Sequence, residues 1–267
     1  MGGVEVQATT LEIIGDSEDY PIAKKEHGIE FLADKRHLWL RSKRQWAIMR
    51  IRNTISFSIH KYFQSEGFMQ MDAPIFTGNA CEGTSTLFET EYYGDTAYLS
   101  QSGQLYGEAM AMAMGKIYTF GPTFRAEKSK TRRHLSEFWM VEPEMAFHDI
   151  FQNMDCIEGM MKAIITDVLE QNRAELEILD RDVRVLESSL KEYPRLTYDE
   201  AVRIIKGEQD VHGVNSIKSL ETELSSKEEE RLALEKDIKD RSDAIAAGGM
   251  KKGKVNFNQT QIDKAKQ

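Results

Sequence analysis

The spacing of apolar residues predicts a long amphipathic helix over residues 45–66. Four apolar side chains recur there one helical turn apart, namely Ile51, Ile55, Ile59 and Phe63. Gly67 follows directly and suits the left-handed residue that ends many helices. Residues 68–71 then predict a short strand that stops before Pro74. On pattern alone this helix and strand are ordinary core elements.

Two strand-like segments follow, at residues 117–124 and 138–147. The first is rich in aromatic and β-branched residues, and the second alternates bulky apolar with acidic residues. The loop between them is strongly basic and contains Arg125, Lys128, Lys130, Arg132, Arg133 and His134. Like charges at this density repel one another, so the hairpin loop is either solvated or bound to an anion.

Two side chains at the ends of this loop favour a nucleotide as the anion. The planar guanidinium group of Arg125 suits the oxygen atoms of a phosphate. Phe138, where the second strand begins, offers a flat face to a base. A nucleotide polyphosphate is therefore the ligand that fits this segment, although spacing alone leaves a solvated surface hairpin equally open.

Residues 98–115 begin as a strand and continue as a helix rich in Ala and Met. Polar residues occupy the junction, which is a common position for a ligand: Ser100, Gln101, Ser102, Gly103 and Gln104. Amide groups both donate and accept hydrogen bonds, which suits a zwitterionic amino acid. Met110, Met112 and Met114 are interpreted as packing residues, and Gly115 as the end of the helix.

The last part of the chain reads as helices. Apolar spacing predicts them at residues 152–173, 198–206 and 216–246, and Thr197 with Glu200 forms a capping-box pattern before the second. A break at 247–249, a basic loop at 250–258 and a helical pattern at 259–267 then predict a helical hairpin.

Polar residues shape two details of this predicted hairpin. Lys227, Arg231 and Arg241 interrupt its apolar seam, which argues against a long free-standing coiled coil. The lysines at its tip, Lys251, Lys252 and Lys254, could contact a polyanion such as RNA, but a solvated tip is favoured.

Composition narrows the class of protein. The chain has 267 residues, 40% hydrophobic content and a formal net charge of −9, which argues against general nucleic-acid binding but not against a local basic site. Its two cysteines, Cys81 and Cys156, are far apart and indicate neither a metal site nor a disulfide framework. No apolar run approaches membrane-spanning length and no signal segment is evident, so we expect a cytoplasmic protein without a membrane partner.

The N-terminal residues predict a short strand-like segment followed by a linker. Residues 4–14 alternate like one or two strands, but so short a segment cannot bury a sheet alone. Residues 16–27 are polar and charged, as in a linker.

The basic hairpin carries a family resemblance. Its sequence from Phe124 to Phe147, FRAEKSKTRRHLSEFWMVEPEMAF, resembles motif 2 of class II aminoacyl-tRNA synthetases. It is similar to the aspartate/asparagine subgroup and closer to the asparaginyl members. The resemblance implies that Arg125 is the catalytic residue and binds the α-phosphate of ATP, that His134 reaches the γ-phosphate and that Phe138 stacks on adenine. It also implies that Glu127, Arg133 and Leu135 line the ATP site.

The same resemblance extends to the amino-acid site. Gln101, Ser102 and Gln104 match the Q-S-x-Q signature of the subgroup, and Glu82 matches the acid that binds the α-ammonium group, although a lone loop acid is often only solvated. Aspartyl members resemble Q-S-P-Q-x-x-K-Q here, and this chain has Gly107 at the lysine position and Glu108 after it.

Glu108 bears on the choice between asparagine and aspartate. A carboxylate accepts a hydrogen bond from an amide but repels a second carboxylate. Glu108 therefore predicts asparagine as the substrate, unless it lies on the outer face of its helix.

The resemblance implies an α+β fold, a partial class II antiparallel sheet with flanking helices. The expected domains are an OB-fold remnant at 1–15, a linker at 16–44, a partial catalytic domain with motifs 1 and 2 at 45–206, and a truncated helical-hairpin insertion at 207–267. Motif 1 implies a homodimer. Motif 3 and the acids that bind Mg²⁺ are not found, so we expect a piece of a longer enzyme that is inactive alone.

The implied activity is that of an asparagine–tRNA ligase acting on ATP, asparagine and tRNA-Asn. Three alternatives stay open: an aspartyl enzyme, a synthetase-like paralogue that makes asparagine, and a non-catalytic interaction module. A metal site within this chain is not expected.

Overall fold

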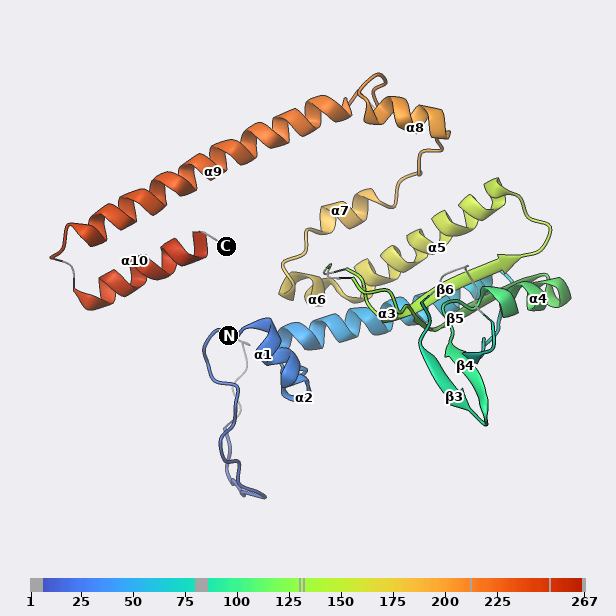
Figure 1. Cartoon of the computed structure of the whole chain (residues 1–267), viewed down its shortest axis with the longest axis horizontal. Helices are drawn as coiled ribbons and strands as arrows, with labels where there is room; N and C mark the ends of the chain where they lie inside the picture. The colour runs from blue at the N-terminus through green and yellow to red at the C-terminus, as the bar shows by residue number, and fades with distance from the viewer. Residues whose placement is uncertain are drawn as a thin grey trace. The chain divides into compact units, whose positions relative to one another are not determined.

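The computed structural model describes residues 7–79, 86–129, 131, 133–211, 213–249 and 251–265. The chain divides into two compact units, Met1–Tyr193 and Pro194–Gln267. The first contains α1 (Ile29–Asp34), α2 (Arg36–Trp39), α3 (Lys43–Ser65), β1 (Met69–Gln70), β2 (Phe76–Thr77), β3 (Glu89–Tyr92), β4 (Asp95–Leu99), α4 (Gln104–Met114), β5 (Lys116–Phe124), β6 (Glu137–Met145), α5 (Ile150–Gln171), α6 (Arg173–Ile178) and α7 (Val183–Ser188) (Figure 1). The second contains α8 (Tyr198–Ile205), α9 (Ser216–Ala246) and α10 (Lys252–Ala265).

Two small sheets form the framework of the first unit. One has the order β1-β5-β6, and the other has the order β2-β4-β3. β5 and β6 are antiparallel from the pair Lys116 and Met145 to the pair Phe124 and Glu137, which confirms the predicted hairpin. The α+β class is also confirmed, although β1 runs parallel to β5.

Ser100 connects the two sheets at the end of β4. Its backbone N–H donates to the carbonyl oxygen of Ile75 at 2.8 Å. Its own carbonyl oxygen accepts from the backbone N–H of Phe124 at 2.9 Å. The end of β4 and the end of β5 are therefore joined through one buried residue.

The predicted helix over residues 45–66 is α3, and its apolar face builds the core. Ile59 and Phe63 are buried together with Phe68, Tyr118 and Cys156. The ring of Phe63 stacks on that of Tyr118 with 4.7 Å between centroids. α3 and α5 lie side by side over the sheet (Figure 1), so the helical period of this segment fixes which face covers the β5–β6 hairpin.

Gly67 ends α3 as predicted. Its φ is +78°, and its N–H donates to the carbonyl oxygen of Gln64 at 3.2 Å. The N–H of Phe68 donates to the carbonyl oxygen of Phe63 at 2.9 Å, and the two rings meet edge to face at 5.0 Å. These paired bonds and the apolar contact define a Schellman motif, which turns the chain sharply from α3 into β1.

A second core cluster is buried between α5 and α6, and its members are Ile165, Val168, Leu169 and Leu176. Beside it, Arg50 of α3 donates from Nε to Oε1 of Glu175 at 2.6 Å. Only 5% of Glu175 is exposed. Burial alone raises the pKa of this carboxyl group, but hydrogen bonds from Arg50, the backbone and Asn172 outweigh it and lower the pKa below 4.5.

Replacing Arg50 with alanine should lower the free energy of unfolding by about 2 kcal/mol, because the Glu175 carboxylate loses its charged donor. Since the pKa of Glu175 is depressed in the folded state, its contribution is present above pH 4.5 and is lost as the pH falls through the folded value. Urea unfolding at pH 7 and pH 3 measures both effects. The control is Arg184→Ala, which removes an exposed ion pair and should change stability by less than about 0.5 kcal/mol. Equal losses in the two variants would contradict the prediction.

Three interpretations from the sequence are wrong. Residues 7–14 form no strand, because no other described segment pairs with them. Residues 252–258 are not a loop but the first turns of α10, since Asn258 and Ile262 are buried. Met112 is 73% exposed and Met114 is also exposed, so strong helix propensity did not place them in the core.

The second unit confirms the predicted helical hairpin. Thr197 and Glu200 form the capping box of α8, with Thr197 N–H donating to Glu200 Oε2 at 2.8 Å. α9 has the predicted bounds, and α10 turns back along it (Figure 1). The unit boundary lies at Tyr193 and Pro194. The domain limits expected from the sequence, and the packing of residues 198–206 near the nucleotide site, stay predictions.

Within the described ranges, no helix combines the length and the apolar character that crossing a membrane requires.

Candidate active site

The mouth of the β5–β6 hairpin forms a cavity of about 640 Å³. It is lined by all the side chains that the sequence assigned to ATP, together with Ser129: Arg125, Glu127, Arg133, His134, Leu135 and Phe138. The strand register explains the convergence, because Phe124 pairs with Glu137 and the Arg125 N–H then donates to the Ser136 carbonyl oxygen at 2.9 Å. Arg125 and Phe138 thereby occupy opposite strands at the base of the loop.

Local contacts orient several of these residues. His134 Nδ1 is hydrogen-bonded to the hydroxyl group of Thr131. The Thr123 hydroxyl group donates to the Phe138 carbonyl oxygen at 3.2 Å, which holds the strand behind the Phe138 ring. Two guanidinium groups and one imidazole face a single carboxylate, Glu127, in this lining, so the cavity favours an anion. Lys130 and Arg132 lie outside the described residues.

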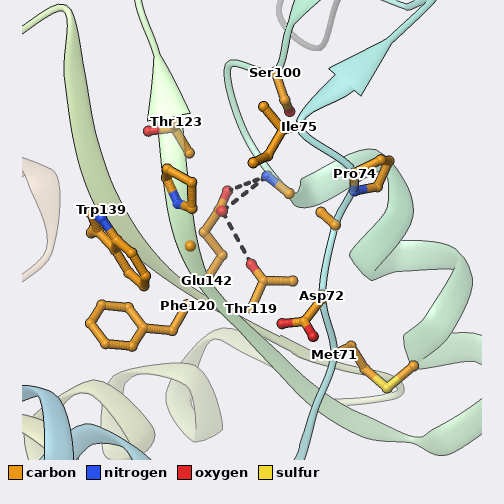
Figure 2. A pocket seen from close by; sticks show the side chains of 14 residues that line it. Met71, Asp72, Pro74, Ile75, Ser100, Thr119, Phe120, Thr123, Trp139 and Glu142 are labelled. Atoms are coloured by element: carbon orange, nitrogen blue, oxygen red, sulfur yellow. Dashed lines mark hydrogen bonds between the residues drawn. The ribbon is translucent and has the colours of Figure 1, made fainter.

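A second cavity, of about 240 Å³, lies beside β5 and is lined by Glu142 of β6 (Figure 2). The Glu142 carboxylate accepts hydrogen bonds from three residues. The Ser102 hydroxyl group donates to Oε1, the Gly103 N–H donates to Oε2 at 2.9 Å, and the Thr119 hydroxyl group donates to Oε2 at 3.2 Å. These donors fix the direction of the carboxylate.

Gly103 makes this arrangement possible. A Cβ atom at this position would lie 2.7 Å from the Thr119 hydroxyl oxygen and 3.2 Å from Glu142 Oε2. Any larger residue would push apart the donors around the carboxylate. The glycine of the Q-S-G-Q sequence therefore allows the N-terminal end of α4 to approach β5 and β6 closely.

The predicted amino-acid-binding residues separate into two groups. Gln101 and Ser102 are buried at the start of α4, where Ser102 contacts Glu142. Gln104 and Glu108 are exposed, and the Gln104 amide donates to Glu108 Oε1 at 3.0 Å. None of these four residues lines the second cavity. Glu82 lies outside the described residues.

Glu142 is a site residue that the sequence analysis missed. Side chains alternate along a strand, so Phe138 and Glu142 point to the same face of β6, ~13 Å apart. The acidic residues within the apolar strand 138–147 were the available signal. The forty-residue separation between Ser102 and Glu142 meant that their contact could not be read from local pattern.

The site has opposite charge at its two ends. Glu144 follows Glu142 on the same face of β6. Burial raises the pKa of Glu144, and the negative charges of Glu108 and Glu142 raise it further. A ligand that spans this face would meet cations near Arg125 and carboxylates near Glu142. Phosphate groups at one end and an ammonium or amide group at the other would match that polarity.

Among the described residues, no three His, Cys, Asp or Glu side chains are grouped closely enough to hold a metal ion.

Comparison with known proteins defines the class. Residues 28–252 match the family of class II tRNA synthetases (D, K and N), and the chain belongs to this family. It is 58% identical over 205 residues to asparagine–tRNA ligase from Sorangium cellulosum, and the match covers 76% of this chain and 46% of that protein. It is 56% identical over 206 residues to the enzyme of the same name from Desulforamulus reducens, covering 77% of this chain and 48% of the relative.

A solved structure shows the same likeness. The crystal structure of asparaginyl-tRNA synthetase from Pyrococcus horikoshii complexed with asparaginyl-adenylate superposes with a TM-score of 0.70 at 36% identity. The match covers 76% of this chain and 46% of that chain. The present chain thus spans about half the length of the curated relatives it matches.

Proposed function

We propose that the whole protein to which these residues belong is an asparagine–tRNA ligase. The observation that carries the proposal is the polarity of one sheet face, with Arg125 and Phe138 at one end and Glu142 at the other. An aminoacyl-adenylate has matching parts: a base, a phosphate and an amino acid. The relatives that share this sequence at 56–58% identity are asparagine–tRNA ligases, which supports asparagine as that amino acid.

The proposed reaction has two steps. A carboxylate oxygen of asparagine attacks the α-phosphorus of ATP, a new P–O bond forms, and pyrophosphate leaves. A ribose hydroxyl group at the 3′ end of tRNA-Asn then attacks the acyl carbon, and AMP leaves. The first step brings two anions together, so positioning and fixed positive charge contribute most of the catalysis. Arg125 supplies that charge, and no side-chain nucleophile is required.

Each remaining residue of the nucleotide cavity has a role in binding. The Phe138 ring stacks on adenine, and His134 reaches toward the γ-phosphate. Glu127, Arg133 and Leu135 complete the lining. Mg²⁺ is expected to accompany ATP, and none of these cavity residues is proposed as its ligand.

Selection of asparagine over aspartate is favoured by a hydrogen-bond acceptor near the substrate side chain, and a negatively charged acceptor discriminates most strongly. An amide N–H₂ group donates to a carboxylate, whereas a substrate carboxylate is repelled by it. Two carboxylates are candidates. Glu108 is the one that the sequence predicted, and Glu142 is favoured by geometry because it lines the cavity beside the buried turn at Ser102.

The partners follow from the same proposal. They are ATP, asparagine, tRNA-Asn and a second copy of the protein. The helix, strand and Pro74 at residues 45–74 resemble motif 1, and α3 exposes Trp46, Met49 and Phe57, which are available for a homodimer contact. A cytoplasmic location stays a prediction.

The experiment is ATP–pyrophosphate exchange with the whole protein, supplied with asparagine or aspartate, followed by aminoacylation of a tRNA-Asn transcript. Exchange with asparagine and charging of the transcript is the expected result. Comparable kcat/KM for aspartate would contradict the proposed substrate. Conversion of aspartate to free asparagine without tRNA would identify the paralogue instead.

A further inference from the structure

The turn between α9 and α10 concentrates positive charge. Lys251, Lys252 and Lys254 lie within four positions, and the sequence has no Asp or Glu between Asp243 and Asp263. The chain as a whole has a net charge of −9, so this segment differs from its surroundings. We call Lys251, Lys252, Lys254 and Phe257 the tip cluster.

Three cations of α9 differ from those of the tip cluster because they are paired. Arg231 donates to Glu235 at 2.6 Å, and Arg241 donates to Asp237 at 2.6 Å. Lys227 contacts Glu230 at 2.8 Å. In the part of the chain that the structure describes, the three tip lysines are exposed and contact no carboxylate. Asp and Glu outnumber Lys and Arg along the rest of α9 as well, so positive charge on this helix is offset locally, whereas the charge of the tip cluster is available to a partner.

Helical structure gives the tip cluster a defined surface. α10 begins at Lys252, and Lys254 and Phe257 are three residues apart on one face of the helix. The Phe257 side chain is 58% exposed. An exposed ring beside unpaired lysines is the combination that contacts phosphates and stacks an unpaired base.

The seam of the hairpin holds this surface in place. Arg241 donates from a terminal nitrogen to Asn258 Oδ1 at 3.3 Å, and Asn258 is only 8% exposed. Ile262 is buried one turn further along α10. A polar pair within an apolar seam selects one register, so α10 cannot slide along α9 without breaking it. The lysines are thereby fixed at the end of a 31-residue helix, which is ~46 Å long.

We propose that the tip cluster binds RNA, with its lysines on the phosphate backbone and Phe257 against an unpaired base. The identification of this RNA as tRNA rests on the proposed function. An anionic membrane fits less well, because a membrane-surface helix needs a broad apolar face. On α10 the apolar residue Ile262 is buried against α9, and Val255 is half-buried. Among the described residues of α10, this leaves Phe257 as the exposed large apolar side chain.

The test measures binding of the 267-residue chain to a tRNA-Asn transcript by fluorescence anisotropy over a range of salt concentrations. The test variant carries Lys251→Gln, Lys252→Gln and Lys254→Gln. Its matched control carries Lys227→Gln, Lys236→Gln and Lys239→Gln, three exposed lysines on α9. We expect the tip variant to raise Kd by about tenfold or more and to lower the slope of log K against log salt by about two. The control should stay within about twofold.

Phe257→Ala separates stacking from charge. It should weaken binding by about fivefold or more while leaving the salt slope unchanged, because a stacked base contributes without releasing counterions. Vesicles of phosphatidylserine and phosphatidylcholine serve as the competing probe. Equal losses in the tip and control variants, no loss in the tip variant, or tighter binding of vesicles than of RNA would each overturn the inference.

ATP–pyrophosphate exchange by the whole protein distinguishes this inference from the proposed function, since exchange needs no tRNA. Unchanged exchange with weakened tRNA binding in the tip variant supports both. Absence of exchange in the wild type would overturn the proposed function and leave the RNA measurement interpretable by itself.

Discussion

Replacing Arg125 with alanine in the whole protein should lower the rate of ATP–pyrophosphate exchange by at least about a hundredfold. Arg125 lies at the end of β5, where its guanidinium group lines the cavity together with Phe138. Removing one preorganised cation from a site of developing charge typically costs two to three orders of magnitude in kcat, roughly 3–4 kcal/mol. Single-turnover formation of the adenylate would locate the loss in the chemical step.

Two further variants show whether the loss reflects chemistry rather than folding. Arg125→Lys retains the charge but loses the planar fork, so its activity should be intermediate. Arg184→Ala removes an exposed arginine elsewhere in the same unit and should leave exchange unchanged. Exchange by Arg125→Ala within a factor of three of the wild type would refute the assignment.

Glu142→Gln should reduce the preference for asparagine over aspartate by up to about a thousandfold, measured as the ratio of the two kcat/KM values in exchange. The expected size corresponds to replacing a charge-assisted hydrogen bond by a neutral one while removing the repulsion of aspartate. The geometry that motivates it is the fixed carboxylate, which accepts from Ser102, Gly103 and Thr119.

Glu108→Gln is the matched variant, because it removes the other candidate carboxylate, which lies on α4. If Glu142 recognises the side-chain amide of asparagine, Glu108→Gln should change the preference for asparagine over aspartate by less than about fivefold. The reverse pattern would assign recognition of the amide to Glu108, as the sequence predicted. An unchanged preference in both variants would contradict selection by either carboxylate.

Local patterns predicted those elements whose boundaries depend on local physics. The period of Ile55 and Ile59, the turn at Gly67 and the capping box at Thr197 each act within a few residues, and each was found in the structure. The residues that line the cavity at the mouth of the β5–β6 hairpin could also be named in advance, because the hairpin sequence resembles motif 2.

Features that depend on distant partners could not be predicted in this way. α10 begins in a Gly- and Lys-rich segment that reads as a loop, and burial of Ile262 against α9 outweighs that preference. The alternating residues 7–14 have strand character but no partner within the described chain. Glu142 gains its position from Ser102 and Thr119, neither of which is near it in sequence.

The bridge at Ser100 has a mechanical consequence. One peptide unit accepts from the Phe124 amide beside Arg125, and the same residue precedes the turn that donates to Glu142. The proposed binding sites for the nucleotide and the amino acid are therefore rigidly coupled. A displacement of one site is transmitted to the other over a few bond lengths. Near-attack geometry tolerates errors of well under 1 Å. The Phe124 amide should consequently act as a reporter, and its deuterium uptake should slow when either substrate alone is bound.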